Sequence, residues 1–359
     1  MTKNKDLINS NPLVYQIYPR SFKDSSDENE TDGVGDLKGV IEKLDYLKSL
    51  NVDVLWFSPI NKSPMKDFGY DVSDFREVHE EFGTKKDLKD LINKAHKKDM
   101  KVIVDFVGSH TSNEHEWFEK SRNNVKEVTK DGKEIDYSDF YVWKDPNKND
   151  PHYIEPNNWR SCLDNSSAWQ YDNKKKKFYL HNFLPEQPDL NVNNPQVQDA
   201  LLGEMEYLAD LGVDGFRMDA WLSMQHNEDI PHNPVNKEEN KDNPANLIEL
   251  YEQKHNKNQR HQLEGENAFS PKMAKFIQEK DIFVFTETEC NDAVYSVGQH
   301  FLGRCFIFST GQFLISALSK FSGKIKVLYE LLSDTDIILA DLTDLKSKSL
   351  PVKLSEELP

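Results

Sequence analysis

The chain has 359 residues, with 45 Lys or Arg against 62 Asp or Glu, and a formal net charge of −17. This charge argues against nucleic acids and anionic membrane surfaces as partners, because like charges repel. The three cysteines, Cys162, Cys290 and Cys305, lack metal-ligand spacing, and an odd number without a disulfide framework predicts a reducing compartment. Residues 1–11 are polar and no stretch has the length of a membrane span, so the sequence predicts a cytoplasmic protein.

The first hundred residues alternate between strand-like apolar runs and amphipathic helical runs, which is typical of βα units in a parallel sheet. We expect strands at 13–18, 52–57 and 101–107 and helices at 39–50 and 86–98. Residues 101–107 are apolar on both faces, as in a strand that is covered on both sides. A chain of this length can form one α/β barrel.

The alternation stops at residue 108. From there to 191 the chain is rich in Asn, Asp, Trp and Tyr, without a periodic helix, and this is too long for an ordinary loop. We therefore expect an irregular subdomain inserted at 108–191, between a first barrel part at 1–107 and a second at 192–323. The basic run at 174–177 is interpreted as a solvated turn.

The alternation resumes with a helix expected at 197–211, strands at 213–218, 282–286 and 304–308, and a helix at 313–321. The polar segment 227–258 is predicted to pass over the carboxyl ends of the strands. The last part, 324–359, is predicted to be a diverged tail. Within it, Val327, Leu328, Leu331 and Leu332 have helical spacing and could cover the edge left open by the sixth strand. Residues 336–341 could instead form a strand.

The hexapeptide Gly-Phe-Arg-Met-Asp-Ala at 215–220 carries the strongest chemical signal. In a strand, Arg217 and Asp219 project from the same face. The guanidinium would orient the carboxylate and favour its charge, as nucleophilic attack on a sugar carbon requires. The alternative is a structural Arg–Asp pair at a strand end.

Other stretches of the chain match the same known protein family, in the same order along the sequence. The sequence resembles the α-amylase family of glycoside hydrolases (family 13), and within it the α-glucosidase and oligo-1,6-glucosidase group. The resemblance rests on residues 13–22, 32–36, 43–47, 67–74, 156–159, 179–191 and 215–220. It implies a (β/α)8 TIM barrel with a subdomain inserted after the third strand, here incomplete at its C-terminus.

The resemblance also implies the catalytic groups. Retaining glycosidases use a carboxylate nucleophile and a second carboxyl group as general acid, roughly 5–5.5 Å apart. Asp219 matches the nucleophile, and Glu287, at the end of the next strand, is expected to be the acid. Glu289 is the competing candidate, and a solvated carboxylate is the structural alternative. The family usually has glycine where this chain has Thr286.

Four further residues match substrate-binding positions of the family. These are Tyr70 as a sugar platform, Asp71 and His110 as partners of the glucose hydroxyls, and Arg217. The alternatives are a turn after Gly69 that Asp71 caps, and a structural histidine.

Three departures from the family pattern affect these expectations. Gly108 and Ser109 replace a Pro-Asn pair before His110. In the acidic loop, Asp24, Asp32, Val34 and Asp36 match calcium ligands, but residues 27–31 interrupt their spacing, so a solvated acidic loop is the alternative. No Asn-His-Asp block follows Gln299, so the third catalytic aspartate is missing and the chain is predicted to be a truncated or diverged member.

The expected function is a retaining α-glucosidase-type hydrolase of short α-glucosides, with impaired turnover. The alternatives are a non-catalytic carbohydrate-binding relative, the ectodomain of an amino-acid transporter heavy chain, and an inactive fragment. The bond preference is open as well: Ala220 after the nucleophile favours α-1,4 linkages, whereas the Gln-Pro-Asp-Leu-Asn block at 187–191 is typical of α-1,6-cleaving relatives.

Overall fold

The computed structural model describes residues 12–25, 32–148, 154–164, 166–232, 269–289, 304–308, 326–330 and 337–341. Its centre is one eight-stranded sheet in the order β1-β2-β5-β11-β12-β13-β14-β15. Neighbouring strands are parallel except for the antiparallel pair β14–β15. The strands are β1 (Val14–Ile17), β2 (Val54–Phe57), β5 (Lys101–Val107), β11 (Gly215–Asp219), β12 (Phe283–Glu289), β13 (Arg304–Phe308), β14 (Lys326–Glu330) and β15 (Ile337–Asp341).

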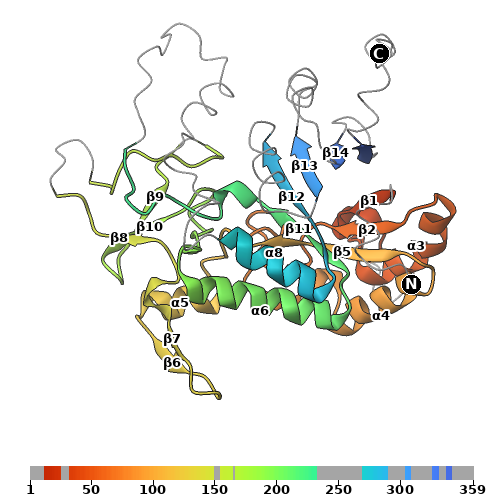
Figure 1. The fold of residues 1–359 in the computed structure, drawn as a ribbon, viewed down its shortest axis with the longest axis horizontal. Coiled ribbons are helices and arrows are strands. Elements are labelled where there is room, and N and C mark those ends of the chain that lie inside the picture. The colour runs from red at the N-terminus through yellow and green to blue at the C-terminus, as the bar shows by residue number, and fades with distance from the viewer. Residues whose placement is uncertain are drawn as a thin grey trace, which may run out of the picture.

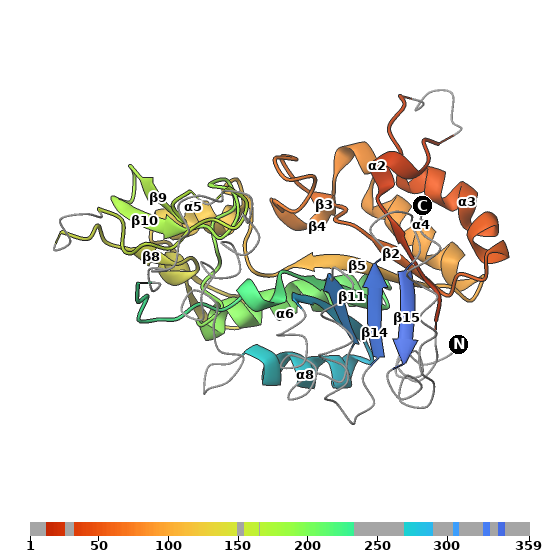
Figure 2. The same cartoon turned by 90° about the horizontal axis from the view of Figure 1, so that it is seen from above.

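Helices pack along the outside of this sheet (Figures 1 and 2). They are α2 (Pro19–Phe22), α3 (Leu37–Ser49), α4 (Lys85–His96), α6 (Pro195–Leu211) and α8 (Phe269–Lys280). Their ends follow local sequence signals. Thr84 and Asp87 form a capping box at the start of α4, and Gly212 ends α6 with a φ of 118°. Within the described residues, no helix is both long and apolar enough to cross a bilayer.

The inner face of the sheet is lined by alternate residues of successive strands, as in a barrel interior. Val54 and Trp56 of β2 pack there with Ile103 of β5 and with Phe283 and Phe285 of β12. Gly215 opens β11 where β12 approaches closely, and a Cβ at this position would overlap the Phe283 carbonyl oxygen. The carboxyl ends of β5, β11 and β12 therefore meet at one end of the sheet.

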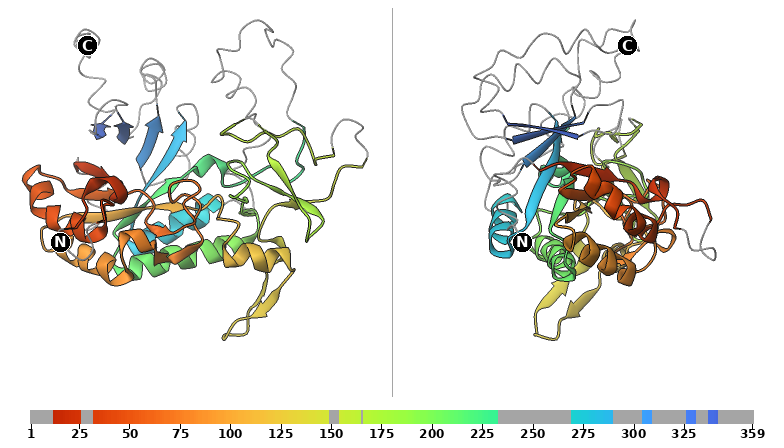
Figure 3. Two further views of the ribbon diagram at one scale, coloured as in Figure 1. Left: turned by 180° about the vertical axis from the view of Figure 1, so that it is seen from behind. Right: turned by 90° about the vertical axis from the view of Figure 1, so that its right-hand side faces the viewer.

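Between β5 and α6 the chain forms smaller elements, and the β6–β7 hairpin projects from the body of the molecule (Figure 3). Here lie α5 (Glu116–Arg122), β6 (Lys126–Val128), β7 (Glu134–Asp136), β8 (Trp143–Lys144), β9 (Trp169–Asp172) and β10 (Lys177–Leu180). A separate apolar cluster around Trp159, Trp169 and Phe178 supports the β8-β10-β9 sheet. The short pair β3 (Asn61–Lys62) and β4 (Asp74–Val78) follows β2. The domain boundaries stay predictions.

The run at 174–177 lies in an exposed turn, as expected, in which Lys174 also pairs with Glu119 and Lys175 bonds to the carbonyl of Ser138. Two expectations are wrong. The stretch 108–191 does contain a helix, α5, in which Phe118 and Ser121 are buried. Residues 326–330 of the tail are a strand rather than a helix. This strand, β14, pairs with β13, so the edge expected to be open is covered.

The other strand limits agree with expectation to within a few residues, and β15 confirms the strand alternative for 336–341. Helix α8 is not anticipated by the sequence analysis. The helix expected at 313–321 and most of the segment 227–258 lie outside the described residues.

Candidate active site

Arg217 and Asp219 lie on the same face of β11, as the spacing predicts. The Arg217 guanidinium donates to Asp219 Oδ1 at 2.5 Å, and both side chains are buried, at 3% and 7% exposure. A guanidinium bonded to a carboxylate fixes its direction and balances its charge. The predicted pair is confirmed as a contact, and its catalytic role stays a prediction.

Asp105 of β5 joins this pair, and the sequence analysis did not single it out. Its carboxylate accepts from Trp56 Nε1 at 2.5 Å, from the Tyr70 hydroxyl at 2.9 Å and from Arg217 Nη1 at 3.1 Å. It is 1% exposed. The signal that could have revealed it is register, since Asp105 and Arg217 are paired positions of adjacent parallel strands.

Tyr70 lies in the loop between β3 and β4, and its hydroxyl reaches into this network. Burial, together with the charge of Asp105, raises the pKa of Tyr70 well above its usual value. The phenol therefore stays protonated and acts as a donor to Asp105. Its ring is half-buried, which leaves part of it accessible to a ligand.

Asp71 is fully buried beside it, and its carboxylate holds the loop. Oδ1 accepts from Ser63 Oγ at 2.8 Å and from the Asp67 amide at 3.0 Å, and Oδ2 accepts from the Lys66 amide at 2.9 Å. These bonds fit the capping alternative. A direct contact of Asp71 with a sugar hydroxyl stays a prediction.

His110, which follows β5, is held by a residue that the sequence analysis did not single out. The side-chain oxygen of Gln187 accepts from the Leu184 amide at 3.0 Å, which fixes the direction of the amide group. Its nitrogen therefore faces Asp67 Oδ2 at 2.9 Å and His110 Nε2 at 3.1 Å. Because that nitrogen donates, His110 Nε2 accepts and the imidazole is neutral.

Burial supports the same conclusion, because it lowers the pKa of His110 to about 4. The other ring nitrogen lies 3.0 Å from Ser109 Oγ, so the serine that replaces the family asparagine still contacts the imidazole. Gln187 is fully buried, and only the matching block at 187–191 hinted at its place.

Glu287 lies in β12, next to β11. The register pairs Met218 with Thr286, so Asp219 and Glu287 follow as neighbours at the carboxyl ends of adjacent strands. Adjacent strands lie about 4.8 Å apart. The side chains of Glu287 and Glu289 lie outside what the structure describes, and the backbone alone places Glu287 beside Asp219.

The acidic loop before α3 is described only at its ends. Asp24 Oδ2 accepts from the Gly33 amide at 2.7 Å, Asp32 Oδ1 from the Val34 amide at 2.8 Å, and Asp36 Oδ1 from the Gly39 amide at 2.6 Å. Among the residues that the structure describes, Asp24 Oδ1 is buried without a hydrogen-bond partner, as a metal ligand would be. Within the described ranges, however, no three acidic, histidine or cysteine side chains converge on one point. The described ends of the loop therefore do not by themselves build a calcium site.

Comparisons with known proteins show the family of the chain. The family model of the α-amylase catalytic domain matches residues 16–317. The fold and the site thus define an α-amylase-type barrel protein. The chain belongs to the α-amylase family.

The individual relatives include an enzyme and a transporter subunit, so they do not establish one activity for this chain. Oligo-1,6-glucosidase of Parageobacillus thermoglucosidasius is 49% identical over 207 residues, which are 58% of this chain and 34% of that protein. The amino acid transporter heavy chain SLC3A1 of Rattus norvegicus is 44% identical over 239 residues, 66% of this chain and 33% of that one. The chain thus spans about a third of the length of these relatives.

A solved structure extends the similarity. The crystal structure of an α-glucosyl transfer enzyme, XgtA, has a TM-score of 0.74 at 34% identity, covering 92% of this chain and 60% of the other. Since a glucosidase and a transporter heavy chain are almost equally similar in sequence, identity alone does not choose between them.

Proposed function

We propose that the chain is a retaining α-glucosidase-type hydrolase of short α-glucosides. The observation that carries this proposal is the buried Arg217–Asp219 pair beside the register position of Glu287. Asp219 would attack the anomeric carbon and form a covalent glycosyl-enzyme, while Glu287 protonates the leaving oxygen. Glu287 would then take a proton from water, which attacks the anomeric carbon and releases both glucose and Asp219.

Turnover of 4-nitrophenyl α-glucoside by the purified chain tests this proposal. We expect release of nitrophenol that falls at least about 10³-fold in Asp219→Asn, because the nucleophile is lost. Since residues 299–359 contain no Asn-His-Asp block, we expect the wild-type rate to be about 10²- to 10³-fold below that of a relative that has one. Full wild-type activity would show that another residue supplies the missing group.

The second candidate is a carbohydrate-binding protein without turnover. The similarity to a transporter heavy chain supports it, since that relative is named for transport rather than hydrolysis. Maltose binding that persists in Asp219→Asn, with no nitrophenol release by the wild type, would favour this candidate.

The preferred linkage depends on the end of β11. Ala220 follows Asp219 with a φ of 44°, a left-handed backbone that a β-branched residue adopts only at a cost. We propose a preference for α-1,4 bonds, because the small side chain leaves room beside the nucleophile. Faster cleavage of isomaltose than of maltose would refute this preference.

Calcium binding by the acidic loop and the cellular location of the protein are proposals as well. If the loop from Asp24 to Asp36 holds calcium, 1 mM CaCl2 should raise the melting temperature relative to EDTA, and Asp24→Asn should abolish the increase. An equal melting temperature in both buffers would favour a solvated loop. The cysteine pattern supports a cytoplasmic location, which cell fractionation would test.

A further inference from the structure

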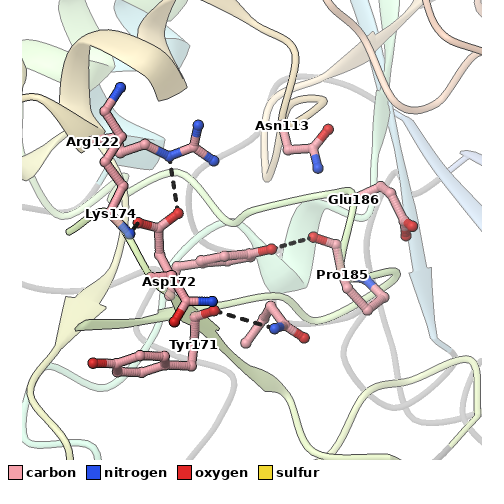
Figure 4. A pocket seen from close by; sticks show the side chains of 10 residues that line it. Asn113, Arg122, Tyr171, Asp172, Lys174, Pro185 and Glu186 are labelled. Carbon is pink, nitrogen blue, oxygen red and sulfur yellow. Dashed lines mark hydrogen bonds and ion pairs between the residues drawn. The ribbon is translucent and has the colours of Figure 1, made fainter. Parts of the chain in front are cut away.

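A pocket lies on the inserted region, away from the Arg217–Asp219 pair, with a volume of about 550 Å³. This is within the range of small-molecule sites, about 300–1,000 Å³. Figure 4 shows two sides to it: Arg122, Asp172 and Lys174 on one, and Asn113, Pro185 and Glu186 on the other. The first group comes from α5, the end of β9 and the β9–β10 turn, and the second from the segments next to His110 and Gln187.

The charged side of the pocket is internally neutralised. Arg122 pairs with Asp172 Oδ2 at 2.9 Å and with Glu119 at 2.9 Å, and Lys174 pairs with Glu119 at 2.6 Å. The bonds from Lys174 and Asn123 lower the pKa of Glu119 to about 2, so its charge persists at neutral pH. Two cations thus face two anions, and Glu186 adds a further negative charge. An anionic ligand such as a phosphate would find no excess positive charge here.

The opposite side offers polar groups that are still available to a ligand. Among the described residues, no hydrogen bond joins the Asn113 or Glu186 side chain to another residue, whereas their backbones are tied by a 2.8 Å bond. An amide both donates and accepts, and a carboxylate accepts. Together with Gln170 and the ring of Tyr171, these groups match the mixed donors and acceptors of sugar hydroxyls.

The pocket is separated from the candidate active site by one segment of chain. Glu186 lines the pocket, while the next residue, Gln187, bonds to His110 and Asp67. The segment is a turn closed by a 2.8 Å bond from the Gln187 amide to the Leu184 carbonyl, and it presents Glu186 to the pocket and Gln187 to His110. The two sites are thus back to back, and a ligand in one does not occupy the other.

We propose that this pocket is a second saccharide site, which binds a neutral mono- or disaccharide of hexoses and not a phosphorylated sugar. The planar amide and carboxylate groups supply the hydrogen bonds, and the balanced ion pairs exclude anions. Because the pocket is open to solvent, we expect weak binding, with a Kd on the order of 1 mM. Binding of a saccharide at this second site does not require hydrolysis at the candidate active site.

Equilibrium dialysis with radiolabelled maltose tests the proposal in the Asp219→Asn chain, which holds but does not cleave the sugar. We expect two maltose molecules per chain, and one after the added changes Asn113→Ala and Glu186→Ala. Gln170→Ala alone should weaken the second site about 3- to 10-fold. The matched control is Glu114→Ala, which removes an exposed carboxylate next to Asn113 but outside the pocket, and two molecules should still bind.

The outcomes separate this proposal from the function proposed above. If the candidate active site does not hold maltose, the stoichiometry falls from one to zero with the pocket variants, and the second site stands. An unchanged stoichiometry in the folded pocket variants, checked by circular dichroism, overturns it. Tighter binding of glucose 6-phosphate than of glucose, lost in the same variants, would overturn the neutral-ligand assignment.

Discussion

Asp105 is the residue on which the candidate site converges, because one carboxylate accepts from Trp56, Tyr70 and Arg217. It would not touch the reacting atoms, so we regard it as a positioning residue. In Asp105→Asn, an amide would face these donors and Arg217 would lose one of its two carboxylate partners. We expect kcat/KM to fall about 10²-fold and stability to fall by about 3–5 kcal/mol.

The matched control directly precedes the neighbouring strand, β11. Asp214 is buried like Asp105 and binds Lys101 at 2.9 Å and His96 at 2.6 Å. Asp214→Asn should lose similar stability while keeping kcat/KM per folded molecule, as measured by steady-state kinetics and urea unfolding. An equal loss of activity in both variants would mean that Asp105 acts only through stability.

Gln187 donates to His110 Nε2, and we expect that reversing the polarity of its side chain changes the protonation state of the imidazole. In Gln187→Glu, the introduced carboxylate would face His110 Nε2 and Asp67 Oδ2. A proton on the imidazole would then become favourable, so we expect the pKa of His110 to rise from about 4 to above 6.5. Imidazole titration by NMR measures this pKa, with Ser109→Ala as a control that leaves the Nε2 partner in place.

A pKa of His110 that stays near 4 in Gln187→Glu would show that burial alone sets it.

The contacts of the candidate site also show how much of it could be predicted from the sequence. The Arg217–Asp219 contact is predictable because two residues of one strand make it. Asp105 and Gln187 act on partners 112 and 77 residues away, and only register and loop packing bring them there.

At the level of elements, the close approach of β11 and β12 sets the spacing of Asp219 and Glu287. A methyl group at Gly215 would overlap the Phe283 carbonyl, so Gly215→Ala must displace one strand from the other. We expect a loss of about 1–3 kcal/mol in stability and a fall in activity at the candidate site. Urea unfolding and nitrophenyl glucoside turnover measure the two effects.

Gly203 on α6 provides the matched substitution, because a Cβ there meets no atom within 4 Å. Gly203→Ala should therefore raise stability by about 0.5–1 kcal/mol through helix propensity and leave activity unchanged. A stabilising Gly215→Ala would contradict the strand spacing described here.

The elements also show why some sequence predictions succeed. The strand at 101–107 is predicted because burial on both faces leaves an unbroken apolar run, and α4 because its capping box and apolar spacing agree. The tail is mispredicted because Val327 and Leu328 fit either period. These residues form a strand because β14 pairs with β13. This pairing is a tertiary contact, which a local sequence pattern does not reveal.

For the whole molecule, buried titratable groups should give stability a maximum near pH 6.5. Burial lowers the pKa of His110 and of His115 to about 4, below the ordinary 6.5. Burial raises the pKa of Asp189 to about 8, above the ordinary 3.8. These shifts act in opposite directions on the pH dependence of unfolding.

Between pH 4 and 6.5 the unfolded chain binds two more protons at the histidines, and the folded chain binds one more at Asp189. The unfolded state thus binds one proton more, and stability rises with pH by roughly 1.4 kcal/mol per unit. Of these three groups, only Asp189 differs between pH 6.5 and 8, where the folded state binds more protons and stability falls by a similar slope. We expect stability to be about 2 kcal/mol lower at pH 5 and at pH 8 than at pH 6.5.

Asp189→Asn separates the two limbs of this curve. Asp189 accepts from the Asn182 backbone at 3.1 Å and from its side chain, and an amide of the same shape keeps the site neutral at every pH. The fall above pH 6.5 should disappear, and the rise between pH 4 and 6.5 should steepen toward two protons. Urea unfolding at pH 5, 6.5 and 8 measures both limbs. A fall above pH 6.5 that persists in Asp189→Asn would assign it to a different group, and Asp189 would then be ionised in the folded chain despite its burial.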